Sequence, residues 1–335
     1  MSYEYSEITD PTYLATRQER NEPEYVLVRP TDHSKVPIQD PNWTPKPSVL
    51  TSVFRNIDNA LQKFEVLPDD VWLASYPKSG TTWCQEMVWL VCNDLDYKRA
   101  ADVDLVERFP SMKLSGLFSR PGEHRPFKEV LEMPKPRFIK THLHVGLLPE
   151  QIWTVKPKIV YVHRNPKSVA VSFYHHSASF TGYKGTLEDF IRSFMRDLQL
   201  YSPYHEHVVE YNMLNHLENV LILRYEDMKQ DLLSELKRAC QFFNKQYSDK
   251  QLETLSKHLS FESMRDNPAV NFSRMVDPRT GFKIPPMESL PENQRFMRKG
   301  KADGYKEELS LELQKEIDEW TQNKIKSPEH LKLFM

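Results

Sequence analysis

The clearest pattern along this chain is an apolar run that ends in a short polar turn and is followed at once by an amphipathic segment. Residues 71–75 read VWLAS, residues 78–82 read KSGTT, and apolar positions resume with WCQEMVWLVC over residues 83–92. This order predicts a strand, a loop that can cradle a phosphate, and a helix whose first N–H groups point toward that loop. Gly80 in the turn would let the backbone approach an anion closely.

Similar short apolar runs recur further along the chain. Residues 137–141, 158–163 and 219–223 predict three more strands, and each is followed by polar or basic residues. The other predicted helices cover residues 49–64, 167–179, 187–200, 203–216, 232–243, 249–258 and 311–324. Strands that alternate with helices predict an α/β fold, here a single domain with a central parallel sheet flanked by helices. Ligands of such folds bind at the carboxyl ends of the strands.

Two stretches lack this alternation. Residues 1–48 are polar and rich in proline, which predicts an irregular N-terminal arm in front of one domain over residues 49–335. Residues 265–300 are rich in Pro, Asn and Arg, and a long loop of this kind in a compact domain usually serves as a lid or a binding loop. We therefore expect this second segment to close over a ligand.

Composition and charge narrow the choice of function. The net charge is −2, so no overall positive field attracts nucleic acid, and any attraction for phosphate must be local. The three cysteines show no metal-binding spacing and fit buried free thiols in a reducing compartment. No apolar run approaches the roughly 18 residues of a membrane span, and the N-terminus lacks an apolar signal core, which predicts a cytoplasmic protein.

The predicted strands lead into residues suited to phosphate or sulfate chemistry. Lys78 follows the first strand, the second runs into Lys140 and His142, and Arg164 follows the third. In an extended chain Lys140 and His142 point to the same face. A neutral imidazole beside a cation can serve as a general base near pH 7. Taken alone, His142 fits a structural histidine as well as a catalytic one.

The polar turn differs from an ordinary P-loop. That motif, G-x-x-x-x-G-K-[ST], has its lysine after the second glycine, whereas here Lys78 precedes Gly80. The order Y-P-K-S-G-T-T-W over residues 76–83 resembles the first signature of the cytosolic sulfotransferases, which bind 3′-phosphoadenosine-5′-phosphosulfate (PAPS). The other motifs of that family follow in the same order, as K-T-H-L at 140–143, Y-V-H-R-N-P-K-S-V-A-V-S at 161–172, R-Y-E-D-M at 224–228, H-L-S-F-E-S-M at 258–264 and F-M-R-K-G at 296–300.

This resemblance implies a P-loop-like loop that binds the phosphosulfate group, and a nucleotide site assembled from several motifs. It implies that His142 is the general base and that Lys78 and Lys140 stabilise charge during transfer. The implied nucleotide contacts are Lys78, Ser79, Gly80, Thr81, Thr82, Trp83, Arg164, Ser172, Tyr225, Ser260, Phe261, Met297, Arg298, Lys299 and Gly300. Within this set, Arg164 and Ser172 would hold the 3′-phosphate, and the aromatic residues would face the adenine.

The resemblance also implies what the protein acts on. The reaction would move a sulfuryl group from PAPS to a hydroxyl or amine of a small, largely apolar acceptor, without a metal, a nucleic acid or a membrane as partner. Phenylalanines line the acceptor pocket in many members of the family. The matching positions here are Ser111, Leu114 and His176, so we expect a pocket of different shape and polarity.

Several positions depart from the family pattern. His144 stands where proline is common, and Tyr305 where the family has tryptophan. The family often forms dimers through a K-x-x-x-T-V-x-x-x-E segment, in which this chain has Ser310-Leu311 and Lys315 instead of Thr-Val and Glu. A two-fold contact repeats each unfavourable residue twice. We therefore predict a monomer, or a dimer through a surface other than residues 306–315.

Three alternatives stay open from the sequence. A retinoid dehydratase-like member of the same family would follow sulfonation with elimination, which gives net dehydration of an allylic alcohol. A P-loop nucleotide kinase would share the strand, loop and helix, although the displaced lysine and the lack of a hydroxyl–carboxylate pair for Mg²⁺ disfavour it. A non-enzymatic module would keep the nucleotide site without the chemistry, which the presence of Lys78, Lys140 and His142 disfavours.

Overall fold

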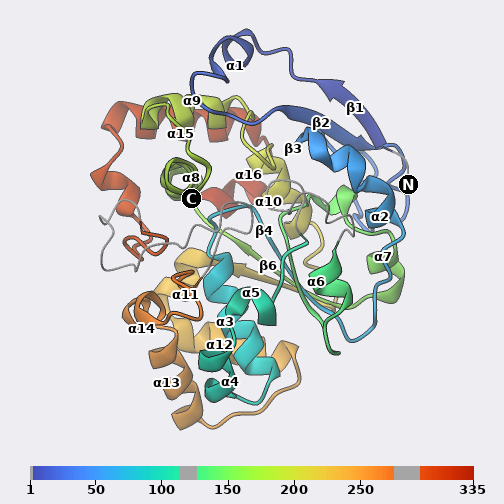
Figure 1. The fold of residues 1–335 in the computed structure, drawn as a ribbon, viewed down its shortest axis with the longest axis vertical. Coiled ribbons are helices and arrows are strands. Elements are labelled where there is room, and N and C mark those ends of the chain that lie inside the picture. The colour runs from blue at the N-terminus through green and yellow to red at the C-terminus, as the bar shows by residue number, and fades with distance from the viewer. Residues whose placement is uncertain (1–2, 113–126, 275–294) are drawn as a thin grey trace.

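A four-stranded parallel sheet runs through the centre of the molecule. The computed structural model describes residues 3–112, 127–274 and 295–335. The strands are β4 (Val71–Ser75), β5 (Phe138–Thr141), β6 (Lys158–His163) and β7 (Val220–Arg224), in the order β5-β4-β6-β7. The α/β prediction, with one parallel sheet flanked by helices, is confirmed (Figure 1).

Helices cover both faces of the sheet, and alternate residues of each strand face opposite cores. Leu73 of β4 packs with α3 and α12, whereas Trp72 packs with the N-terminal strands and α7. All residues of β4 are buried, as expected for a strand covered on both faces. The larger helices are α3 (Thr81–Cys92), α8 (Pro166–His176), α9 (Leu187–Met195), α10 (Tyr204–Asn212), α12 (Leu232–Phe242), α13 (Asp249–His258) and α15 (Leu311–Lys324), and α7 (Gln151–Val155) is short.

Shorter helices complete the described residues. They are α1 (Pro11–Thr16), α2 (Asp58–Gln62), α4 (Tyr97–Asp102), α5 (Leu105–Arg108), α6 (Lys128–Leu131), α11 (Tyr225–Gln230), α14 (Phe261–Asp266) and α16 (Pro328–Leu331). The start of the predicted loop at residue 265 therefore falls inside α14, and residues 275–294 of that loop lie outside the described ranges. In those ranges, no helix is long and apolar enough to cross a membrane.

The prediction of an irregular arm over residues 1–48 is wrong. This segment contains α1 and three antiparallel strands, β1 (Tyr3–Glu7), β2 (Tyr25–Pro30) and β3 (Ser48–Thr51), in the order β1-β2-β3. The predicted helix at 49–64 is also wrong, because β3 gives way to a 3₁₀ turn at Ser52–Asn56 and then to α2. The four residues of β3 are all buried, so tertiary packing decides their conformation.

The N-terminal sheet packs into the main core. Val28 of β2 is fully buried in the same cluster as Trp72 of the central sheet. The sheet therefore cannot leave without opening one face of the domain. Figure 1 shows β1, β2 and β3 in blue beside the central strands.

The parallel strands lead directly into helices at their carboxyl ends. β4 is followed by the five residues 76–80 and then α3, β6 by α8, and β7 by α11. Asn165 caps α8 by accepting from the Lys167 N–H, and Pro166 occupies the first turn. Helix N-termini attract anions, so this edge of the sheet is suited to phosphate.

We predict that the N-terminal sheet unfolds together with the rest of the domain. Val28→Ala removes two methyl groups from a fully buried site and should lower the free energy of unfolding by about 2 kcal/mol. Leu14→Ala, on α1 and 55% exposed, should change it by less than about 0.5 kcal/mol. Urea unfolding followed by circular dichroism checks both. An unchanged midpoint for Val28→Ala would show that this sheet is separable.

Candidate active site

The turn between β4 and α3 packs closely against Tyr225 and requires a glycine at position 80. Gly80 has a φ of 103°, and a Cβ atom there would lie 2.7 Å from Cδ2 of Tyr225, so only glycine fits. The Ser79 hydroxyl is buried and has no hydrogen-bond partner in the described ranges. Thr81 is tied back to the strand, with its Oγ1 2.7 Å from Ser75 Oγ. Thr82 is half-buried at the start of α3.

Lys78 is surrounded by cations from other segments of the chain. Burial, followed by the nearby charges of Lys140, Arg164 and Arg298, lowers the pKa of Lys78 to about 7. Its ammonium group lies 4.5 Å from the centre of the Phe296 ring. The structure thus brings together Lys78 after β4, Lys140 of β5, Arg164 after β6 and Arg298 at one edge of the sheet.

His142 is held in one tautomer by the neighbouring strand. Its Nδ1 lies 2.7 Å from the carbonyl oxygen of Ser75. A carbonyl can only accept, so Nδ1 carries the hydrogen and Nε2 keeps its lone pair. Burial, followed by the positive charge of Lys140, lowers the pKa of His142 to about 3, so the imidazole is neutral at pH 7. The ring centre of Tyr201 lies 5.4 Å from that of His142.

The backbone around His142 is fixed by side chains of α10 that the sequence did not point to. His207 Nε2 lies 3.1 Å from the His142 carbonyl oxygen, and the Tyr161 hydroxyl lies 2.9 Å from His207 Nδ1. The Tyr211 hydroxyl donates to the Leu143 carbonyl at 2.8 Å. A contact between an imidazole and a carbonyl far along the chain leaves no local pattern, so periodicity could not reveal it.

Aromatic side chains gather beside the turn at the predicted adenine positions. The Trp83 and Tyr225 rings meet edge to face, with centres 5.4 Å apart. Trp83 Nε1 donates to the Leu259 carbonyl at 2.9 Å, which places α14 beside α3. Gly300 has a φ of 61°, and a Cβ atom there would meet the Phe261 ring at 2.2 Å. Residue 300 is thus brought against Phe261 by close packing.

The remaining predicted nucleotide residues lie around these aromatic rings. The guanidinium of Arg164 lies 4.1 Å from the centre of the Tyr225 ring, and its Nε is buried without a partner in the described residues. Ser172 is half-buried in α8, and Met297 packs against the core formed with α3. Ser260 caps α14 by accepting from the Ser263 N–H at 3.2 Å, so its hydroxyl has a structural role here.

The cations of the R-K-G segment already have acidic partners. Arg298 pairs with Glu308 at 2.6 Å, and Lys299 pairs with Glu307 at 2.7 Å. Lys301 also pairs with Glu307, at 2.7 Å. Glu307 and Glu308 therefore offset part of the charge of these cations in the absence of a phosphate.

Two of the three predicted acceptor residues lie near Lys78 or Lys140. Ser111 forms an isolated parallel bridge with Lys140. His176 ends α8, and after burial the charges of Lys78 and Lys140 lower its pKa well below the ordinary value. Leu114 lies outside the described residues.

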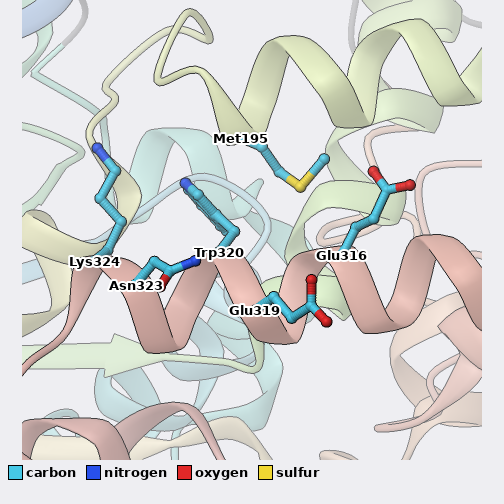
Figure 2. A pocket seen from close by; sticks show the side chains of 6 residues that line it. All are labelled: Met195, Glu316, Glu319, Trp320, Asn323 and Lys324. Atoms are coloured by element: carbon cyan, nitrogen blue, oxygen red, sulfur yellow. The ribbon is translucent and has the colours of Figure 1, made fainter.

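A hollow elsewhere on the surface contains none of these residues. Figure 2 shows it between α9 and α15, lined by Met195, Glu316, Glu319, Trp320, Asn323 and Lys324. Among the described residues, no group of three or more His, Cys, Asp or Glu side chains is arranged to hold a metal ion. The sheet edge is therefore where the chemistry-bearing side chains converge.

The fold and this edge define an α/β protein with a P-loop-like turn. Residues 68–329 match the family model described as "Sulfotransferase domain". The chain therefore belongs to the sulfotransferase family, whose enzymes transfer sulfuryl groups.

Known relatives agree with this assignment. Luciferin sulfotransferase of Photinus pyralis is 41% identical over 286 residues, which cover 81% of this chain and 76% of the relative. Sulfotransferase 1E1 of Bos taurus is 32% identical over 262 residues, covering 77% and 84%. Retinol dehydratase, solved with androsterone and the inactive cofactor PAP, superposes with a TM-score of 0.79 at 26% identity and covers 98% of this chain and 99% of that one.

We predict that the protein takes up protons at Lys78 when it binds PAP, the 3′,5′-bisphosphate nucleotide. With a pKa of about 7, Lys78 is about half-protonated at neutral pH, and an anion beside it favours the charged form. Affinity should therefore fall as the pH rises above 7, by at most about tenfold per unit. Calorimetry in buffers of different ionisation enthalpy measures the uptake. The same proton count in Lys78→Met and wild type would refute this assignment.

We also predict that Glu308 competes with the nucleotide for Arg298 and Lys299. Glu308→Gln removes the carboxylate charge beside Arg298 and leaves Lys299 paired with Glu307 alone. It should tighten PAP binding about fivefold, the equivalent of about 1 kcal/mol for a partly buried pair. Glu312→Gln, an exposed site on α15, serves as the control and should leave affinity unchanged. Weaker binding in a folded Glu308→Gln protein would instead make Glu308 part of the site.

Proposed function

We propose that this enzyme transfers a sulfuryl group from PAPS to a hydroxyl or amine of a small, largely apolar acceptor, with His142 as the general base. The observation that carries the proposal is the hydrogen bond from His142 Nδ1 to the Ser75 carbonyl, because it leaves Nε2 with a lone pair beside Lys78 and Lys140. Relatives named as sulfotransferases and a neighbour solved with PAP support the choice of donor.

The residues present fit a phosphate-bearing nucleotide. Ser79 Oγ and Arg164 Nε are buried polar atoms without partners in the described residues, and buried polar atoms are normally satisfied. Gly80 lets the Tyr225 ring pack closely against the turn, and the Trp83 ring lies beside Tyr225. PAPS, when bound, supplies the sulfuryl group together with a phosphate leaving group.

The side chains divide the remaining work. Lys78 and Lys140 place positive charge where negative charge builds during transfer. His142 accepts the proton of the acceptor at Nε2. In the ligand-free protein, burial and these cations keep the pKa of His142 at about 3, which makes it a weak base. An anion beside the lysines offsets their charge and raises that pKa, so the base gains strength when the donor is in place.

A second candidate is sulfonation followed by elimination, as in a dehydratase. It is favoured by the superposition with retinol dehydratase over nearly the whole chain. A panel of phenols, steroid alcohols and retinol, incubated with PAPS labelled in its sulfuryl group, separates the two. Mass spectrometry would find a labelled ester in the first case, and an unlabelled dehydrated product in the second. No consumption of PAPS with any acceptor would overturn both.

The proposal also covers the location, the metal requirement and the oligomeric state of the enzyme. We propose a cytoplasmic enzyme that acts on small molecules without a metal. We propose a monomer, or a dimer through a surface other than residues 306–315. In the latter segment, Leu311 is 84% exposed on α15. The lid over residues 265–300 likewise remains a prediction.

We predict that His142→Ala abolishes transfer but keeps nucleotide binding. Loss of a general base should lower kcat by about 10²- to 10⁴-fold, while the dissociation constant of PAP should stay within about threefold, because Trp83, Arg164 and Tyr225 are untouched. His216→Ala, at an exposed histidine after α10, is the control. Loss of PAP affinity in a folded His142→Ala protein would contradict the assignment of His142 to the acceptor side.

A further inference from the structure

A buried histidine–glutamate pair lies immediately behind the candidate base. His144 follows His142 by two residues, and its Nδ1 lies 3.2 Å from Oε2 of Glu210 on α10. Both residues are 2% exposed. The other ring nitrogen, Nε2, lies 3.0 Å from the carbonyl oxygen of Tyr201. His144 therefore joins the segment after β5 to α10 and to the segment that carries Tyr201.

The hydrogen bonds of His144 determine how many protons the pair holds. The Tyr201 carbonyl can only accept, so Nε2 carries a hydrogen. The proton between Nδ1 and Glu210 then belongs either to an imidazolium facing a carboxylate or to a carboxylic acid facing a neutral imidazole. Both arrangements keep the two bonds of His144, and both leave the pair with no net charge. A buried pair of this kind is costly to break by removing one partner.

Tyr201 needs to be held in place. Its φ is 69°, a left-handed conformation that residues with side chains rarely adopt. Its N–H donates to the Val49 carbonyl at 2.8 Å, and its own carbonyl accepts from His144. The ring of Tyr201 flanks His142, with the two ring centres 5.4 Å apart. A shift of this segment would therefore be felt at the base.

The same helix holds His142 by a second route. His207, one turn before Glu210 on α10, contacts the His142 carbonyl, and its ring centre lies 4.8 Å from that of His144. One stretch of α10 thus fixes the base through its own carbonyl and, by way of Glu210 and His144, through its neighbour Tyr201.

We propose that Glu210 and His144 are positioning residues, which hold Tyr201 and His142 in the geometry needed for proton transfer. The inference rests on the proposed function, with His142 as the base. This role depends on the two hydrogen bonds of His144 and not on the charge of Glu210. An uncharged side chain at position 210 that donates to Nδ1 therefore preserves it. A misplacement of about 1 Å at a reacting group can lower the rate about 10²-fold.

Three variants test the proposal. Glu210→Gln can donate its amide N–H to Nδ1 of a neutral His144, so it should keep kcat within about threefold. Glu210→Ala removes that partner and should lower kcat about 10²-fold and raise the acceptor KM, with PAP affinity unchanged. The double variant His144→Leu, Glu210→Leu replaces both polar groups by apolar ones, which buried pairs often tolerate without loss of stability. It should fold as stably as wild type and still lose kcat.

The outcomes distinguish positioning from stability. A double variant with native unfolding behaviour and full kcat would overturn the proposal, as would Glu210→Gln with the same defect as Glu210→Ala. Loss of PAP affinity in the folded double variant would also overturn it, since the pair would then serve the nucleotide side. If wild type fails to transfer from PAPS to any acceptor, the proposed function itself is wrong, and that result precedes any comparison of variants.

Discussion

Mutual repulsion among cations at one edge of the sheet is the constraint on which the site depends. Lys78, Lys140, Arg164 and Arg298 come from four separate segments of a chain whose net charge is −2. Burial, followed by the charges of the other three, lowers the pKa of Lys78 from the ordinary range of a lysine to about 7. An anion at this edge therefore relieves repulsion as well as gaining attraction, which favours binding of a highly charged nucleotide.

The neighbouring acidic residues temper that repulsion in the ligand-free protein. Glu308 contacts both His175 and Arg298, and although burial opposes the effect, these hydrogen bonds lower the pKa of Glu308 to about 2. The carboxylate stays charged at neutral pH and offsets part of the positive field. The buried cations attract phosphate, and without a ligand their mutual repulsion is unfavourable. The glutamate lowers this repulsion while the positive charge near the turn remains.

The sequence predicted features that depend on neighbouring residues, and it did not predict contacts between residues far apart in the chain. The strand at 158–163 and the helices at 249–258 and 311–324 have the predicted bounds, because apolar periodicity and polar flanks define them. The placement of lysines at strand ends followed from parallel topology. The N-terminal sheet was missed because its stability depends on pairing between strands about twenty residues apart and on burial against the central sheet. Glu307 and Glu308 carry no motif, and only the folded chain shows which cations they meet.

The hydrogen bonds between β3 and the segment of Tyr201 connect the N-terminal sheet to the surroundings of His142. Val49 accepts from the Tyr201 N–H and donates to the Ser202 carbonyl, both at 2.8 Å, so the strand and this segment are joined on both sides of one residue. The first fifty residues are consequently connected to His142 through Tyr201, whose ring centre lies 5.4 Å from that of His142. A substitution that moves Val49 therefore also moves Tyr201 and Ser202. The N-terminal sheet and the residues around His142 are in this sense expected to evolve as one unit.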